Sequence, residues 1–150
     1  MIFSDFWKNE KDRLEPSDSQ LDLLGNSKEL SPQRKRFDGA MAFRRFTDTI
    51  KANGGDDEAY RQAVITETEE LFDCEVRELY RLTGGKPNKR HTLPHEVQQA
   101  YMVNETLSAY ELERMEGTIG GESQQEVNDR IDAVVREQSK QTRKRLPWAK

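Results

Sequence analysis

The clearest candidate for chemistry is the pair Gly84-Gly85 followed by Lys86, because glycine-rich loops that end in lysine can bind phosphate groups. A phosphate-binding loop of the Walker type needs the pattern G-x-x-x-x-G-K-[S/T] between a strand and a helix. Here Tyr80 occupies the first glycine position, Pro87 replaces the Ser or Thr, and a helical pattern precedes the loop. We therefore interpret the glycine pair as a helix terminus, where glycine adopts the left-handed conformation at little cost.

The two histidines and the single cysteine do not form a catalytic or metal-binding pattern. His91 and His95 have a spacing that can bind zinc when both lie on one helix, but Pro94 places a helix start between them. Cys74 lies in an apolar helical pattern, where a buried thiol is common. The sequence therefore predicts no enzyme, no metal and no cofactor, and the lone cysteine favours a reducing, cytoplasmic compartment.

A DNA-binding helix-turn-helix is the strongest functional pattern, and it begins at Ile65. This interpretation places a turn at Asp73 and a short recognition helix after it. It has apolar residues at most of the required positions, but the small residue needed where the helices cross is replaced by Glu69. Glu75 and Glu78 also oppose contact with phosphate. The competing interpretation, equally weighted, is one long amphipathic helix from about residue 56 to 82.

Basic residues follow this unit and recur near the C-terminal end of the sequence. An exposed basic cluster can neutralise phosphates, and binding of that kind weakens steeply with salt. We predict association with nucleic acid, expected to be DNA bound by a homodimer, in a small regulatory or accessory protein. The net charge of -4 counts against this function, because nucleic-acid coat proteins are basic throughout. The predicted contacts are Arg77, Arg81, Lys86, Lys89, Arg90, Arg143, Lys144 and Arg145.

The alternative function is a protein–protein adaptor, because large aromatic residues occur in polar terminal segments. Such residues are favoured as anchors of interfaces, where their rings leave water. The competing interpretation is that one or both tryptophans pack on the core of the chain itself. The partner-binding candidates are Phe3, Phe6, Trp7 and Trp148.

The composition limits the size of the core that must position these residues. A chain of 150 residues forms one domain, and 33% hydrophobic with 35% charged residues predicts a modest core with solvated extensions. No apolar run approaches the roughly 20 residues that span a bilayer, and the first residues lack the features of a secretory signal. We expect a soluble protein without membrane association.

Apolar residues at helical spacing predict an all-α fold, a small bundle of three to four helices with flexible N- and C-terminal extensions. Helix starts are expected at Pro32, Asp56, Thr92 and Ser123, and Asn104 interrupts the apolar face of the third helix. The first two helices have opposite net charges, which predicts an antiparallel pair joined by ion pairs. The predicted regions are a flexible acidic segment (1–30), a helical core (31–116), a linker (117–122) and a C-terminal helix with a basic tail (123–150).

Overall fold

The computed structural model describes residues 3–14, 32–118 and 123–149. The described residues contain no strand, which confirms the all-α class, but they form six α-helices rather than three to four. Five of these helices follow residue 31, and η2 is a single 3-10 turn. The helices are α1 (Phe3–Leu14), α3 (Pro32–Ala52), α4 (Asp57–Phe72), α5 (Val76–Thr83), η2 (Arg90–Thr92), α6 (His95–Arg114) and α7 (Gln124–Arg143).

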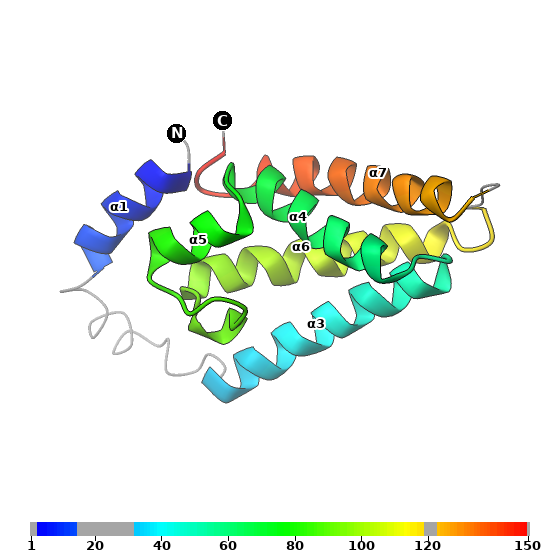
Figure 1. Ribbon diagram of the computed structural model, residues 1–150. Helices are drawn as coiled ribbons and strands as arrows, with labels where there is room; N and C mark the ends of the chain where they lie inside the picture. Colours follow the sequence, from blue (N-terminus) through cyan, green and yellow to red (C-terminus); the bar gives the residue numbers. More distant parts are fainter. Residues whose placement is uncertain (1–2, 15–31, 119–122, 150) are drawn as a thin grey trace.

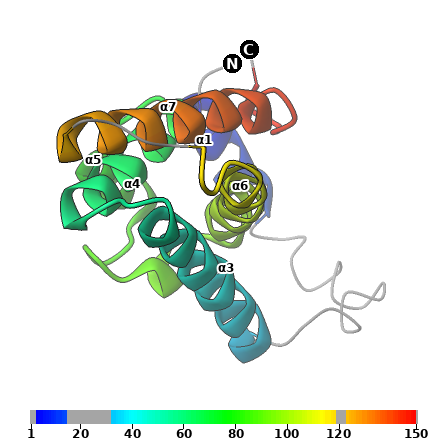
Figure 2. The same cartoon turned by 90° about the vertical axis from the view of Figure 1, so that its right-hand side faces the viewer.

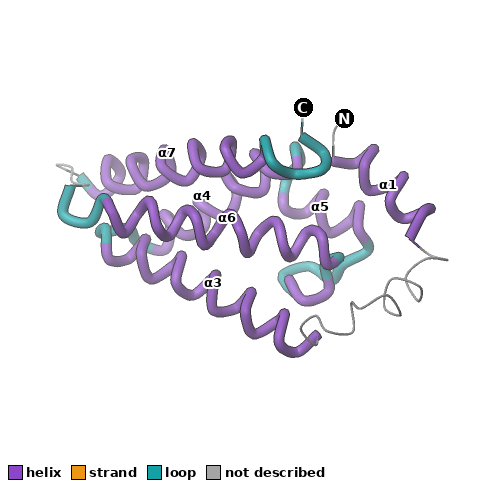
Figure 3. The backbone as a smooth tube through the Cα atoms, turned by 180° about the vertical axis from the view of Figure 1, so that it is seen from behind, coloured by secondary structure: helices purple, strands orange, loops and turns teal. Residues whose placement is uncertain are grey.

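Four long helices form the body of the molecule, and α1 and α5 lie at one end of it (Figure 1). The helix α3 packs along α6, α4 packs along α7, and α6 also contacts α7. The view along the bundle in Figure 2 and the view from behind in Figure 3 show the same arrangement. Among the described residues, no helix is long and apolar enough to cross a membrane.

The predicted antiparallel pair of α3 and α4 is wrong, because these helices touch only slightly. One ion pair of α3 goes to α6, where Arg45 Nε lies 2.7 Å from Glu113 Oε1. The buried side of α4 faces α7 instead, through small residues such as Ala59 and Ala63 in a cluster with Ile131. Charge pattern alone therefore did not identify the helix partners.

Local capping explains several of the helix ends. The Asp56 side chain accepts a hydrogen bond from Ala59 N, and the Ser123 side chain accepts one from Glu126 N. Gly84 ends α5 with φ of 77°, as the glycine pattern predicts. Asp73 has φ of 58° and ends α4, so residues 56–82 are two helices with a turn and not one continuous helix.

The core has two parts, one at each end of the bundle. The end near the Gly54 turn contains aliphatic residues and Phe46, in a cluster with Ile50, Leu112 and Val135. The opposite end contains an aromatic cluster of Phe3, Phe72, Tyr101 and Trp148, packed with Leu71 and Leu79. This second cluster joins α1 and the segment after α7 to α4 and α6.

The expected docking residues Phe3 and Trp148 are buried in this cluster, with 0% and 1% of their surfaces exposed. Their ring centroids lie 4.8 Å apart, and Trp148 Nε1 donates a hydrogen bond to Leu71 O at 2.6 Å. Phe6 and Trp7 are partly buried against the same cluster. The interpretation that the terminal rings pack on the core of the chain therefore holds for Phe3 and Trp148, because large aromatic surfaces gain most from leaving water.

Candidate functional site

The loop between α5 and α6 has a defined shape that Thr92 maintains. The Thr92 hydroxyl accepts a hydrogen bond from Lys86 N at 2.8 Å and donates one to Lys89 O at 2.5 Å. Asn88 adopts the left-handed conformation with φ of 64°, which an asparagine tolerates better than most residues. Thr92 was expected to begin the next helix, but it organises this loop, and α6 starts after Pro94.

The short helix η2 directs Arg90 toward the body of the molecule, where its side chain is partly buried. Its guanidinium carbon lies 4.5 Å from the centre of the Phe43 ring and 4.0 Å from the centre of the Tyr101 ring. Arg90 Nη1 lies 2.7 Å from Glu105 Oε2, and Arg90 Nη2 lies 3.6 Å from Glu67 Oε2. The predicted phosphate contact at Arg90 is therefore replaced by an internal role, because two glutamate side chains and two rings already contact this cation.

The two glutamates below Arg90 are buried side chains from different helices. The side chains of Glu67 on α4 and Glu105 on α6 are 0% and 1% exposed. Asn104 Nδ2 donates hydrogen bonds to Glu67 Oε1 at 3.1 Å and to Ser139 Oγ at 3.0 Å. Polar side chains of α4, α6 and α7 thus meet inside the bundle. Arg90, from the loop, supplies the only guanidinium group in this cluster among the described residues.

Burial raises the pKa of Glu67 well above its ordinary value, and the negative charge of Glu105 raises that pKa further. The Arg90 charge and the Asn104 hydrogen bond act in the opposite direction. Burial also lowers the pKa of Arg90, but the charges of Glu105 and Glu67 outweigh it and raise that pKa overall. A proton on Glu67 reduces the negative charge beside the single guanidinium of Arg90.

Replacement of Glu67 with Gln is expected to flatten the pH dependence of stability. Because the folded-state pKa of Glu67 lies well above its ordinary value of about 4.5, Glu67 keeps its proton in the folded protein to a higher pH than in the unfolded chain. The free energy of unfolding therefore falls as the pH rises from that value toward the folded-state pKa, and Gln removes this contribution. Urea unfolding between about pH 5 and pH 8 measures the change.

Glu116→Gln, at an exposed position, is the control for this experiment. Its stability should follow the wild-type pH dependence across the range. If Glu67→Gln also follows the wild-type curve, Glu67 does not hold a proton in the folded protein. This result would contradict the raised pKa described for Glu67.

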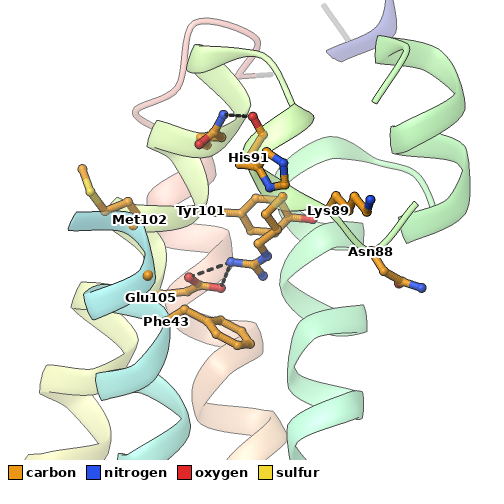
Figure 4. A pocket seen from close by; sticks show the side chains of 11 residues that line it. Phe43, Asn88, Lys89, His91, Tyr101, Met102 and Glu105 are labelled. Carbon is orange, nitrogen blue, oxygen red and sulfur yellow. Dashed lines mark hydrogen bonds and ion pairs between the residues drawn. The ribbon is translucent and has the colours of Figure 1, made fainter. Parts of the chain in front are cut away.

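A pocket of about 630 Å³ lies over this cluster, between α3, α6 and the loop. Figure 4 shows Met102 and Glu105 on one side of it and Asn88 and Lys89 on the other. Gly39 contributes to the wall from α3, and a Cβ atom added there would have no heavy atom within 4 Å. The lining residues are Gly39, Ala40, Phe43, Asn88, Lys89, Arg90, His91, Gln98, Tyr101, Met102 and Glu105.

The other predicted nucleic-acid contacts divide between the surface and the interior. Arg143 donates hydrogen bonds to Asp73 Oδ2 at 2.6 Å and to Trp148 O at 3.2 Å, and its side chain is only 13% exposed. Like Arg90, Arg143 therefore stabilises the fold instead of facing a ligand. Arg81 pairs with Glu78 on the surface of α5. The remaining candidates are exposed, namely Arg77, Lys86, Lys89, Lys144 and Arg145.

The structure gives no metal site among the residues it describes, since no three His, Cys, Asp or Glu side chains there are grouped to hold an ion.

Burial raises the pKa of the Cys74 thiol to about 11, and the neighbouring Glu78 charge adds to this effect. A thiol with such a pKa is a weak nucleophile, because the thiolate is the reactive form.

Sequence reasoning missed the two glutamates that define the site. Glu67 and Glu105 each occur in a helix with several other acidic residues that are not buried, so the residue type gave no signal of burial. The one available signal was Asn104, a polar residue on an apolar helical face. A polar residue in that position predicts buried hydrogen-bond partners, because an unpaired buried amide is costly.

Comparisons with protein-family models, with curated proteins and with solved structures found no match to this chain.

Proposed function

We propose that this chain is a non-enzymatic regulatory protein that binds nucleic acid through the loop between α5 and α6. The observation that supports this function is the exposure of Lys86 and Lys89 on a loop whose shape is fixed by Thr92 and by the buried ion pairs of Arg90. A cation held on an ordered loop loses less conformational entropy on binding than one on a free segment. Neither ammonium group is in an ion pair with the part of the chain that the structure describes.

The turn at Asp73 adds a second element to this surface, because it directs α5 away from α4 and leads into the basic loop. Arg77 on α5 is exposed and extends the set of available cations. However, α5 has only 8 residues and also carries Glu78. We therefore infer contact with the phosphate backbone by the loop, and not insertion of α5 into a groove, because carboxylates near phosphates oppose binding.

The other expectations about partners have unequal support. Lys144 and Arg145 are exposed and remain candidates for additional phosphate contacts. A homodimer and a preference for DNA over RNA remain predictions. Docking of a protein partner by the terminal aromatics has less support, because exposure of Phe3 or Trp148 would require the aromatic core cluster to open.

Replacement of both Lys86 and Lys89 with Gln is expected to weaken nucleic-acid binding and its salt dependence. Each lost phosphate contact should reduce the magnitude of the slope of log K against log salt concentration by about 1, so this slope should be smaller by about 2 in the double variant. Fluorescence polarisation with labelled single-stranded and duplex oligonucleotides, over a range of salt concentrations, measures both quantities.

The matched control is Lys51→Gln with Lys140→Gln, which removes two exposed cations at the end of α3 and on α7. This control has the same net charge as the loop variant, so it separates local contact from general attraction. Wild-type protein that binds neither kind of strand would exclude the proposed function. Equal weakening by the two double variants would exclude the loop as the site.

A further inference from the structure

The pocket beside the basic loop has the size and the lining of a site for one small planar molecule. Its volume of about 630 Å³ falls within the range of roughly 300 to 1,000 Å³ that is usual for small-molecule pockets. It opens next to Lys89, which belongs both to the pocket wall and to the proposed phosphate-binding loop. A molecule that enters the pocket can therefore remain attached to a strand on the loop.

The walls of the pocket are suited to a flat ring. Phe43 and Met102 provide aromatic and thioether surface from α3 and α6, while Gly39 and Ala40 leave that side of the pocket without a large side chain. Arg90 covers one face of the Phe43 ring at 4.5 Å and is itself packed between the Phe43 and Tyr101 rings, so the guanidinium fixes the aromatic wall but does not offer a face of its own. Aromatic rings are among the surfaces on which proteins stack unpaired bases, and Phe43 provides one in this wall.

The distribution of charge around the pocket indicates which part of a ligand enters it. Arg90 is already neutralised by Glu105, so the floor of the pocket has no excess charge to attract an anion. Uncompensated positive charge lies at the rim, on Lys89 and the nearby Lys86. The arrangement therefore favours a ligand with an uncharged interior part and a phosphate outside it.

We propose that the pocket over Arg90 accepts one unpaired nucleobase of a strand whose phosphates contact Lys86 and Lys89. This assignment rests on the proposed nucleic-acid function. It specifies that the preferred ligand is single-stranded nucleic acid and not a fully paired duplex. A paired base cannot enter, because its faces are covered by neighbouring bases and its extrusion costs free energy. Arg90 is a positioning residue here, since it fixes the loop and one wall.

The test fills the pocket without removing any charge. Gly39→Phe places a ring in open space, and Gly39→Ala at the same position leaves most of the pocket empty. Ala52→Phe adds the same ring at an exposed position at the end of α3. Fluorescence polarisation would compare a single strand, the same strand with abasic sites, and the matching duplex, with circular dichroism of each variant as a check of folding.

Wild-type protein is expected to bind the single strand about tenfold more tightly than the duplex or the abasic strand. Gly39→Phe should lose this preference while its duplex binding stays the same. Gly39→Ala should lose less of the preference, because a methyl group leaves most of the pocket empty, and Ala52→Phe, which lies outside the pocket, should behave as wild type. If Gly39→Phe does not fold, Met102→Trp fills the pocket from the opposite wall. Equal binding of the normal and abasic strands, or an unchanged preference in the filled variant, would overturn the assignment. The effect of the Lys86 and Lys89 substitutions on duplex binding would still test the proposed function separately.

Discussion

Arg90→Ala is expected to lower the free energy of unfolding by about 3 to 5 kcal/mol, one of the two largest losses predicted for a single substitution in this chain. The substitution leaves the buried carboxyl groups of Glu67 and Glu105 together without their guanidinium partner. It also removes the group packed between the Phe43 and Tyr101 rings. Equilibrium unfolding in urea, followed by circular dichroism, measures the loss.

Lys89→Ala is the matched control, because Lys89 precedes Arg90 in the same loop but is exposed. Its effect on stability should remain within about 0.5 kcal/mol. A second comparison tests the cause of the loss. Because protonation neutralises carboxyl groups, the difference between Arg90→Ala and wild type should decrease at acid pH. If Arg90→Ala is no less stable than Lys89→Ala, the arginine is not the internal partner of the two glutamates.

Trp148→Ala is expected to cost about 3 to 5 kcal/mol, the range for removal of a large aromatic side chain from a core. The indole ring is 1% exposed and packs against the rings of Phe3 and Phe72. Its loss also removes the donor to Leu71 O, which leaves a buried carbonyl without that hydrogen bond. Thermal and urea unfolding both report the change.

Trp7→Ala provides the comparison, since this ring is only partly buried against the same cluster. It should cost less than half as much as Trp148→Ala. Trp148→Phe should fall between wild type and Trp148→Ala, because it keeps an aromatic ring but not the indole N–H group. Similar losses for the two tryptophans would contradict the burial of Trp148.

Several helix ends were predictable because they depend on residues close together in the sequence. Gly84 and Ser123 act through backbone conformation and a side chain that reaches three residues away. Whether a turn or a continuous helix occurs at Asp73 was harder to predict, since an aspartate adopts the left-handed conformation only when the surrounding packing supports it. Here Arg143 holds that turn from the far end of the chain, with its guanidinium bonded to Asp73.

The candidate site was less predictable because its residues come from three separate parts of the chain. The run of basic residues around Arg90 indicated a solvated loop, and nothing local distinguished Arg90 from Lys89. The difference arises from the Glu67 and Glu105 side chains, which α4 and α6 bring beneath the loop. Helical periodicity identifies a buried face, but it does not identify the helix that covers it.

The contact between Phe3 and Trp148 has a consequence for the order of folding during synthesis. Residues near opposite ends of the chain must meet to complete the aromatic cluster, and such non-local contacts form slowly because closing a long loop costs entropy. On the ribosome, α1 cannot complete its packing in this cluster until Trp148 has been translated and has left the exit tunnel. During that interval the apolar surface around Leu71 and Phe72 lacks its final cover, so the nascent chain keeps this surface exposed until the segment after α7 has emerged.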